Sequence, residues 1–458
     1  MAFPPWWVRR VNRPLLGILN PRMRLGGALK VQQTEQWLPR RELDRLQLER
    51  LRALLKHAWE NCPYYRQTMQ RAGLTGGRID GLEDFRRLPL VTKRDIQRHR
   101  DEMIAQNFNP SHLVPNHTGG STGDPLHFFN DHGENLRMRG ARQPRGDMWA
   151  GWKAGKRTVR LWGAGVDVGK SRSLKARLLS WVLNDHLLDC LTMDEDVIAR
   201  HIDFMRRFRA QIIVSYTTIA YLFATKLRES GMRLPHLESV ICSAEVLTGS
   251  QREVIESGFD RPVFNRYGCR EFGLVAAECG LHSGMHVGID QVVLEVVDDA
   301  GEPVDPHEMG NIVITDLFNH GMPFIRYSIE DMGVMSDEPC RCGRGLPLLT
   351  EVAGRESDII RMPSGRRVAC LALMCGFAKD LSGVKNLQLV RYGPTRFTMR
   401  ILKGPAYKDE ELAYLQHHLP AALGSEAEIS YEFVDQVERT PSGKYRFLVS
   451  ELPSDGVK

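Results

Sequence analysis

Residues 117–125 read His-Thr-Gly-Gly-Ser-Thr-Gly-Asp-Pro, so that glycines are interleaved with hydroxyl side chains. Glycine permits positive φ and a close approach of the backbone, and the N–H groups and hydroxyls of such a loop can therefore all point at phosphate oxygens. The stretch lacks Gly-Lys-Ser/Thr, which argues against an ordinary P-loop NTPase. It predicts phosphate binding of another kind, although taken alone it would fit a surface turn equally well.

Downstream of this loop, short β-rich runs alternate with helical ones. The expected strands are 159–162, 212–215, 239–242 and 263–266, and the expected helices between them are 195–208, 217–230 and 250–258. This alternation is typical of an α/β fold in which helices cover both faces of a largely parallel sheet. After about Met285 the β-rich runs continue with few helices, which predicts a smaller β subdomain.

The pattern restarts after Gly-Arg-Glu-Ser-Asp at 354–358. Strand-like segments and one helical segment follow, at 384–391, 396–402, 409–418 and 428–434. We therefore expect a large α/β domain at 1–357 and a small α+β domain at 358–458, joined at Asp358.

A second motif, Asn-Arg-Tyr-Gly-Cys-Arg-Glu-Phe-Gly at 265–273, directly follows a predicted strand. The ring of Tyr267 beside Gly268 can offer a flat face to a base, and the carboxylate of Glu271 can hold Mg²⁺ against phosphate. Ser-Ala-Glu at 243–245 ends another predicted strand. Ligands bind at the carboxyl ends of parallel strands in such sheets, which favours a site here, although a lone tyrosine is more often a core residue.

Three further motifs follow these two along the chain. They are Arg-Tyr-Ser-Ile-Glu-Asp-Met-Gly at 326–333, Gly-Arg-Glu-Ser-Asp at 354–358 and Arg-Thr-Pro-Ser-Gly-Lys-Tyr-Arg at 439–446. Together the motifs are far more specific than any one of them. From about residue 38 to 449 the chain resembles the adenylate-forming enzymes, and most closely their phenylacetate–CoA ligase and capsule-biosynthesis branch.

The resemblance implies an ATP site built from several segments. It assigns ATP binding to Thr118, Gly119, Gly120, Ser121, Thr122, Gly123, Ala244, Glu245, Tyr267, Gly268, Asp331 and Arg355. Within this set Tyr267 would stack on adenine, and Asp331 would bind the ribose hydroxyls with Arg355 nearby.

The resemblance also implies the catalytic groups. Glu271 would coordinate Mg²⁺, and Lys444 would reach the substrate carboxylate and the α-phosphate. Arg270 would bind phosphate or carboxylate, or hold Glu271 in place. Residues 1–357 would form the adenylation domain and 358–458 a mobile cap that turns about Asp358. Adenylation is an in-line displacement at phosphorus, so positioning and charge neutralisation must provide the catalysis.

The chain departs from the family pattern at two places. Many relatives carry a lysine near the end of the phosphate loop, where this chain has Pro125 and Leu126, so one contact to phosphate is missing. The residues before Glu271 are Cys269 and Arg270, whereas the widest pattern has threonine before the glutamate. Arginine is common in the branch that this chain resembles, which supports the narrower assignment.

Cysteine and histidine residues suggest a metal site. Cys279, His282, Cys340 and Cys342 offer three thiols and an imidazole, a set that suits tetrahedral Zn²⁺, and His286 competes with His282 as the fourth ligand. The alternative is four unrelated residues. If zinc is bound, we expect a closed structural site, since no position would be left open for substrate.

The charge of the chain is concentrated at its N-terminus. Lys and Arg number 62 against 56 Asp and Glu, a net +6, and the first 30 residues carry six basic residues and no acid. The remainder is nearly neutral, which argues against a nucleic-acid-binding face. Because Phe3, Trp6, Trp7 and Leu15 accompany these charges, the arm could contact acidic lipid headgroups. The alternative is an arm packed on its own enzyme or on a neighbouring subunit of a homodimer.

The sequence lacks the features of a membrane-spanning or secreted protein. No apolar run approaches the length that spans a bilayer, and the N-terminus does not have the pattern of a secretory signal. The nine cysteines are too irregularly spaced for a secreted disulfide scaffold. We therefore expect a cytoplasmic protein.

These inferences combine into one expected reaction. A small-molecule carboxylic acid and MgATP would give acyl-AMP and pyrophosphate, and coenzyme A would then take the acyl group. Amide formation or AMP transfer in surface-polysaccharide or secondary-metabolite biosynthesis is the alternative within enzymes. A catalytically idle fold used for binding is the alternative of another class, and the intact Glu271, Asp331 and Lys444 argue against it.

Overall fold

The computed structural model describes residues 2–19, 25–118, 125–132, 134–162, 173–190, 195–355, 359–364, 367–370, 373–374, 377, 381, 383–437 and 447–451. Gly119 to Gly123, Asp358 and Lys444 lie outside the described residues, as does the side chain of Arg355. The chain divides into two compact units. The first comprises Met1–Leu247 and Val254–Val352, and the second comprises Thr248–Glu253 and Ala353–Lys458.

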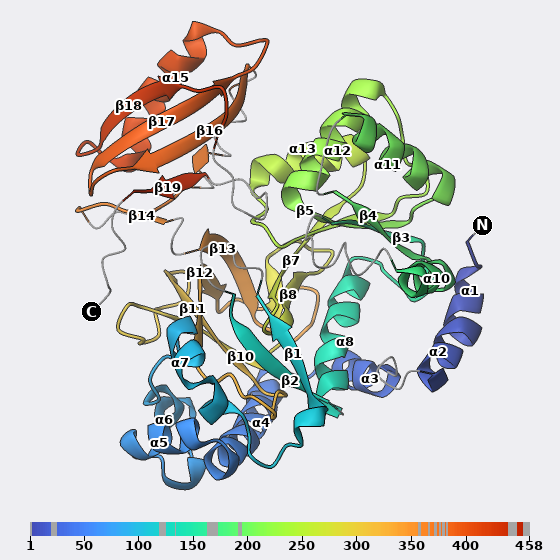
Figure 1. Ribbon diagram of the computed structural model, residues 1–458, viewed down its shortest axis with the longest axis vertical. Coiled ribbons are helices and arrows are strands. Elements are labelled where there is room, and N and C mark those ends of the chain that lie inside the picture. The colour runs from blue at the N-terminus through green and yellow to red at the C-terminus, as the bar shows by residue number, and fades with distance from the viewer. Residues whose placement is uncertain are drawn as a thin grey trace. The chain divides into compact units, whose positions relative to one another are not determined.

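One long sheet organises the first unit (Figure 1). Its parallel part runs in the order β7 (Val263–Cys269), β6 (Ser239–Ser243), β5 (Ile212–Tyr216), β3 (Thr158–Trp162) and β4 (Asp185–Asp189). The helices between these strands include α11 (Glu195–Phe208), α12 (Thr217–Ser230) and α13 (Gly249–Phe259). The predicted alternation is confirmed, and its cause is visible in β5 and β6, where every residue is buried.

The later strands continue the same sheet. Beyond β7 the order is β8 (Gly273–Glu278), β9 (Met285–Val287), β13 (Leu348–Arg355), β12 (Tyr327–Ser336), β11 (Met309–Asp316) and β10 (Val292–Val297). The predicted β-rich part is therefore present, but it is hydrogen-bonded to the parallel strands through β7 and β8, which pair antiparallel. A separate hairpin pairs β1 (Leu113–His117) with β2 (His127–Asp131).

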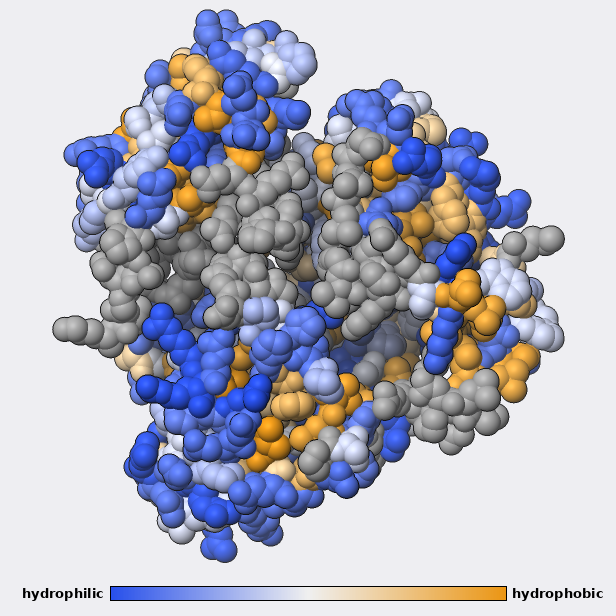
Figure 2. Space-filling view, in the orientation of Figure 1, coloured by the Kyte–Doolittle hydropathy of each residue, from blue (hydrophilic) through white to orange (hydrophobic). Residues whose placement is uncertain are grey.

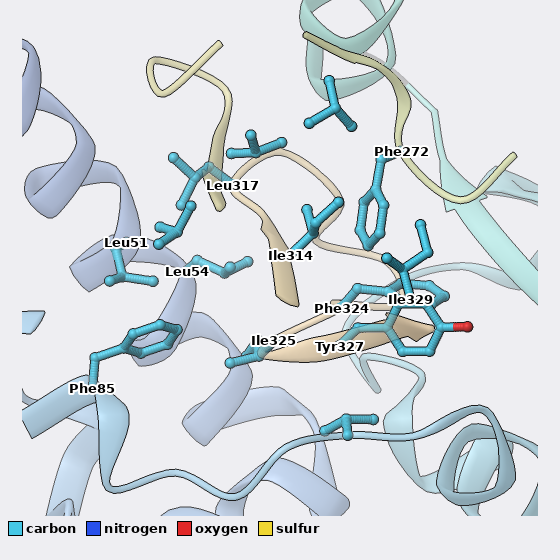
Figure 3. Close-up of a cluster of buried hydrophobic side chains, with 14 of the residues drawn as sticks. Leu51, Leu54, Phe85, Phe272, Ile314, Leu317, Phe324, Ile325, Tyr327 and Ile329 are labelled. Carbon is cyan, nitrogen blue, oxygen red and sulfur yellow. The ribbon is translucent and has the colours of Figure 1, made fainter. Parts of the chain in front are cut away.

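Helices of the N-terminal third cover the antiparallel part. They are α3 (Gly26–Glu35), α4 (Arg40–Asn61), α5 (Pro63–Arg71), α6 (Leu82–Arg86), α7 (Lys93–Met103) and, after the β1–β2 hairpin, α8 (Glu134–Trp149). Leu51 and Leu54 of α4 are fully buried in a core that also contains Phe272, Phe324 and Tyr327 (Figure 3). The ring centroid of Phe324 lies 5.6 Å from that of Phe272 and 5.3 Å from that of Tyr327, so this core anchors Phe272 of the second motif.

The N-terminal arm begins with α1 (Pro5–Trp7), a π-helical turn (Val8–Asn12) and α2 (Arg13–Leu19). Short 3₁₀ turns occur at Thr75–Gly77 and Pro110–His112, and α10 (Leu174–Leu183) precedes β4. Among the described residues, no helix is both long enough and apolar enough to cross a membrane.

The second unit is a small α+β structure, as predicted. Its sheet has the order β18 (Glu428–Phe433), β17 (Arg396–Lys403), β16 (Val384–Arg391) and β19 (Leu448–Ser450). Helix α15 (Asp409–Leu423) buries Leu415, Leu419 and Leu423 in its core, and a short ribbon pairs β14 (Ile359–Arg361) with β15 (Arg367–Ala369). The predicted boundary at 357/358 lies a few residues after the division at Val352, and the roles assigned to the two domains stay predictions.

Candidate active site

The carboxyl ends of β5, β6 and β7 lie at one edge of the parallel sheet. Tyr216 at the end of β5 pairs with Ser243 at the end of β6, and Cys242 pairs with Asn265 of β7. The predicted site residues Ala244 and Glu245 follow β6, and Tyr267 to Glu271 end β7 and begin the next turn. This edge is where an open α/β sheet binds ligands.

The turn after β6 is held by the start of α12. Glu245 accepts a hydrogen bond from the backbone N–H of Thr218 through Oε2 at 2.7 Å, and the Thr217 hydroxyl donates to the Glu245 carbonyl at 3.3 Å. The side chain of Tyr216, the N-cap residue of α12, makes no capping hydrogen bond to the helix. The Glu245 carboxylate therefore satisfies a helix N–H and meets the positive end of the helix dipole. Ala244 is exposed with φ 66°.

The structure brings Tyr267 and Asp331 together from β7 and β12. The Tyr267 hydroxyl donates to Asp331 Oδ2 at 2.7 Å. Burial, together with the negative charge of Asp331, raises the pKa of Tyr267 well above its ordinary value, so the hydroxyl stays protonated and remains a donor. Tyr267, which is expected to face adenine, is thus hydrogen-bonded to Asp331, which is expected to bind ribose.

The residues at the turn between β7 and β8 are closely packed, so few substitutions would fit there. A Cβ on Gly268 would stand 2.3 Å from the carbonyl oxygen of Gly273, so only glycine fits. Glu271 is buried and Phe272 lies in the core, whereas Arg270 is exposed. Burial, followed by the charge of Glu271, raises the pKa of the Cys269 thiol, which is therefore neutral beside the carboxylate.

Buried arginines of α8 hold the backbone of this turn. Arg139 donates to the Glu271 carbonyl, and Arg142 donates to the Phe272 carbonyl at 2.8 Å. Both guanidinium groups pair with the carboxylate of Asp316, at 2.8 Å and 2.7 Å. None of the motifs in the sequence contains these arginines. The only signal was the three-residue spacing of Arg139, Arg142 and Arg145, which more often marks a solvated helix face.

The ends of the phosphate loop are joined by the β1–β2 hairpin. The N–H of Thr118 donates to the Leu126 carbonyl at 3.0 Å, and the Leu126 N–H donates to the Thr118 hydroxyl at 2.9 Å. His117 pairs with His127. Thr118 thus closes the base of the loop, and Gly119, Gly120, Ser121, Thr122 and Gly123 are outside the described residues.

The predicted metal ligands require one correction. Ligand atoms of Cys279, His286, Cys340 and Cys342 all lie within 4.8 Å of one another. His282 is not in this cluster, because it stands in the turn after β8 at φ 51° with its Nδ1 3.2 Å from Glu278 Oε2. The geometry selects His286 as the fourth member.

This arrangement fits the groups that adenylation requires. The Glu271 carboxylate is an oxygen donor of the kind that Mg²⁺ takes, and the Tyr267–Asp331 pair offers an aromatic ring and a carboxylate side by side. No strong nucleophile with an adjacent base is required of such a site, since it acts by positioning and charge.

Comparison with known proteins supports the same resemblance. The model of the CapK C-terminal domain matches residues 363–451. Phenylacetate–coenzyme A ligase of Thermus thermophilus is 27% identical over 332 residues, which cover 70% of this chain and 72% of that protein. Protein CapK of Staphylococcus aureus is 22% identical over 414 residues, 90% of each chain.

The fold has clear neighbours among solved structures. 2-Hydroxyisobutyryl-CoA ligase in the postadenylation state, in complex with an acyl-AMP, matches with a TM-score of 0.73 and 18% identity over 91% of both chains. An anthranilate–CoA ligase in complex with anthranoyl-AMP matches 74% of this chain and 67% of that chain with a TM-score of 0.52 and 16% identity. The resemblance to adenylate-forming enzymes, and the fold that it implies, are thereby confirmed.

Proposed function

We propose that this chain, a relative of the phenylacetate–coenzyme A ligases and of CapK with the fold of the adenylate-forming enzymes, activates a carboxylic acid with ATP. A carboxylate oxygen of the substrate attacks the α-phosphorus of ATP. The bond from that phosphorus to the bridging oxygen breaks, and acyl-AMP and pyrophosphate result. The thiol of coenzyme A then takes the acyl group and AMP leaves.

The observation that carries this proposal is the constellation around the β7–β8 turn. Tyr267 of β7 and Asp331 of β12 meet by a 2.7 Å hydrogen bond, and the buried Glu271 lies in the turn that follows β7. In the proposed site the Tyr267 ring stacks on adenine and Asp331 accepts hydrogen bonds from the ribose hydroxyls. Gly268 lets the chain approach the nucleotide closely, and we assign residues 118–123 to binding of its phosphates.

In this proposal, charge neutralisation is assigned to Mg²⁺, Arg270 and Lys444. Mg²⁺ held by Glu271 would neutralise phosphate charge when bound, and in our proposal Arg270, which is exposed, binds phosphate or the substrate carboxylate. Lys444 supplies a positive charge at the carboxylate and the α-phosphate in our proposal. Adenylation and acyl transfer need different groups over the same acyl carbon, so we assign Asp358 as the joint about which residues 358–458 turn between the two steps.

The fold neighbours lend support to this rotation. Structures of 2-hydroxyisobutyryl-CoA ligase described as postadenylation, open and thioesterification states match this chain with TM-scores of 0.73, 0.63 and 0.61. An Asp358→Pro variant, with φ fixed near −65°, is expected to keep adenylation and to lose at least about tenfold in acyl transfer.

The test is a pyrophosphate-release screen of aryl, fatty and amino acids, with phenylacetate included and with coenzyme A present or absent. We expect release with an aryl or small acid that depends on ATP, and thioester formation when coenzyme A is added. Lys444→Ala should lower adenylation at least about 100-fold while transfer from preformed acyl-AMP is largely kept. Equal loss in both half-reactions would contradict the role of Lys444, and no pyrophosphate with any acid would favour an idle binding fold.

A second candidate is favoured by the CapK similarity, which covers 90% of the chain and includes the C-terminal family match. In this case acyl-AMP is passed to an amine, or AMP is transferred, in the synthesis of a surface polysaccharide. Pyrophosphate release that coenzyme A does not accelerate, together with amide formation from added amino sugars, would select this alternative.

A further inference from the structure

A cluster of three thiols and one imidazole lies in the antiparallel part of the sheet, at the end of β8 opposite the β7–β8 turn. Cys279 directly follows β8, His286 is on β9, and Cys340 and Cys342 stand in the connection between β12 and β13. The Sγ atoms of Cys279 and Cys340 are 3.9 Å apart, and Cys342 Sγ is 3.3 Å from His286 Nε2. Segments about 60 residues apart in the chain therefore converge on one point.

These spacings match a tetrahedral zinc site. Zinc bonds of about 2.3 Å to sulfur and about 2.0 Å to nitrogen place two sulfurs about 3.8 Å apart, and a sulfur and a nitrogen about 3.5 Å apart. A disulfide would need sulfurs about 2.05 Å apart, so Cys279 and Cys340 are not joined as they stand. We propose that Cys279, His286, Cys340 and Cys342 bind one Zn²⁺.

The surroundings of His286 orient its ring for this task. His286 is fully buried, and its Nδ1 lies 3.2 Å from the Leu346 carbonyl. A carbonyl oxygen can only accept, so Nδ1 carries the proton and Nε2 presents its lone pair to the cluster. With four protein ligands the site is closed, and its role is structural.

The metal would stabilise the packing of the α3–α4 junction against the sheet. Arg344 stands two residues after Cys342, and its guanidinium lies 4.6 Å from the Trp37 ring centroid and 4.9 Å from that of Trp149. Arg344 Nε also donates to Gln36 Oε1 at 3.2 Å. The Cys340–Cys342 turn thus connects to the junction of α3 and α4, so loss of zinc should loosen these helices.

Metal analysis of the purified full-length protein tests this site. We expect about one zinc per chain, and replacement by Co²⁺ should give the visible absorption of a tetrahedral thiolate site. Cys342→Ser and His286→Asn should lose the metal and lower the melting temperature. His282→Asn is the matched control and should keep both.

Two results would overturn the site. One is a parent protein that contains no zinc and takes up neither zinc nor cobalt after reduction. The other is a His286→Asn protein that keeps its metal while His282→Asn loses it. If a ligand variant fails to fold, the metal content and cobalt spectrum of the parent protein still decide.

An independent observation concerns the N-terminal arm. Phe3 donates its N–H to Asn184 Oδ1 at 3.1 Å and accepts from Asn184 Nδ2 at 2.8 Å, and its ring centroid is 4.6 Å from that of Trp181. Asn12 donates to the Val182 carbonyl at 2.8 Å. The arm is thus packed on α10 of its own chain, and the two segments form one surface.

That surface is apolar and basic. Large apolar side chains remain exposed on it, namely Trp6 (54%), Leu15 (54%), Leu174 (83%), Leu178 (61%) and Trp181 (43%). Figure 2 shows hydrophobic residues gathered over α1, α2 and α10. Arg9, Arg10, Lys175 and Arg177 are exposed beside them, and residues 2–19 and 173–184 contain no acid.

Tryptophan and leucine flanked by basic side chains match the boundary between acyl chains and acidic headgroups. Asp185, which begins β4 just after α10, is paired with Arg160. From this charge complementarity we infer that the arm and α10 together dock on an anionic lipid surface.

Vesicle flotation tests this surface, with phosphatidylcholine vesicles prepared with and without phosphatidylglycerol. We expect binding only to the anionic vesicles, loss of binding in Trp6→Ser/Leu178→Ser, and about fivefold weaker binding for each charge removed in Arg9→Gln/Arg10→Gln. Leu222→Ser, at an exposed leucine of α12, is the control and should bind normally. Equal binding by all variants would overturn the inference, as would a dimer broken by Leu178→Ser in a protein that binds no vesicles.

Discussion

The turns that follow β6 and β7 start at neighbouring strand ends, but they are held in different ways. Glu245 after β6 is fixed by its own carboxylate, which accepts from the Thr218 N–H in the first turn of α12 near the surface. The backbone at Glu271 and Phe272 after β7 is fixed from behind, by arginines of α8 that pair with the buried Asp316. A local cap holds the first turn, and a long-range charge network holds the second.

This difference suggests a division of labour. A buried ion-pair network keeps its geometry only while every member is present. A turn held in this way is suited to binding phosphate and metal, because these groups are the same whichever carboxylic acid is the substrate. A turn held by one capping bond can change with little loss of stability. We therefore expect the β7–β8 turn to carry the chemistry and the turn after β6 to tolerate substitution.

The largest effect is expected at Asp316. Asp316→Asn leaves two buried guanidinium groups without their counter-charge, and the free energy of unfolding should fall by about 3–5 kcal/mol. Asp337→Asn, which removes the acid from an exposed pair with His307, should cost less than about 0.5 kcal/mol. Urea unfolding of both variants measures the difference, and similar losses would show that the buried network does not hold the turn.

The same network has a predictable pH dependence. Burial alone would raise the pKa of Asp316, but Arg142 and Arg139 outweigh it and lower the pKa below 3.8. Because the pKa is lower in the folded state, the stabilisation is present above about pH 3.8 and is lost as the pH falls further. The Asp316→Asn protein should therefore lose less stability than the parent protein in that acid range.

The next effect is expected on catalysis. Glu271→Gln removes the charged ligand proposed for Mg²⁺, and adenylation should fall at least about 100-fold, roughly 2.7 kcal/mol in barrier. Glu245→Gln, at a residue assigned to ATP binding but not to Mg²⁺, should lower adenylation less, by about fivefold. Pyrophosphate exchange at saturating Mg²⁺ compares the two variants. A larger loss of adenylation in Glu245→Gln than in Glu271→Gln would show that the turn after β6 carries the chemistry instead.

A smaller effect is expected at Tyr267. Tyr267→Phe keeps the ring but removes the donor to Asp331, so KM for ATP should rise about tenfold, near 1.4 kcal/mol, with little change in kcat. Steady-state kinetics at varied ATP measures this split. A fall in kcat with KM unchanged would mean that Tyr267 acts in the chemical step instead of orienting Asp331.

The smallest effect concerns the stability of the exposed turn. Glu245→Ala should lower the free energy of unfolding by about 0.5–1 kcal/mol, because the Thr218 N–H loses its acceptor and α12 loses a favourable charge at its N-terminus. Glu229→Ala at the other end of α12 should change stability by less than about 0.5 kcal/mol. If the two variants were equally unstable, the capping role of Glu245 would be wrong.

Much of the fold could be predicted because its signals are local. The buried strands β5 and β6 are short apolar runs between helices, and the second unit follows the predicted order of strands and helix. The motifs were also visible, since each is a contiguous stretch. The motif at 265–273 points to Tyr267, and the family resemblance assigns Asp331, but neither predicts the hydrogen bond between them.

Other features depend on contacts between distant segments. Asp316 is 174 residues from Arg142, and no local pattern distinguishes a buried arginine from a solvated one. His286 and His282 are equally good ligands by composition. The register of β9 against β13 and β8 places His286 inside, whereas the left-handed turn at His282 directs that residue to Glu278.

By itself, the sequence determined the α/β class, the C-terminal unit and the chemistry that the site residues could perform. These follow from hydrophobic periodicity and from side-chain chemistry, which are properties of short segments. Tertiary structure decided which histidine joins the cysteines, where the N-terminal arm packs and what holds Glu271 in place. These depend on strand register and on charges that become strong only when burial removes water, and neither can be known before the segments meet.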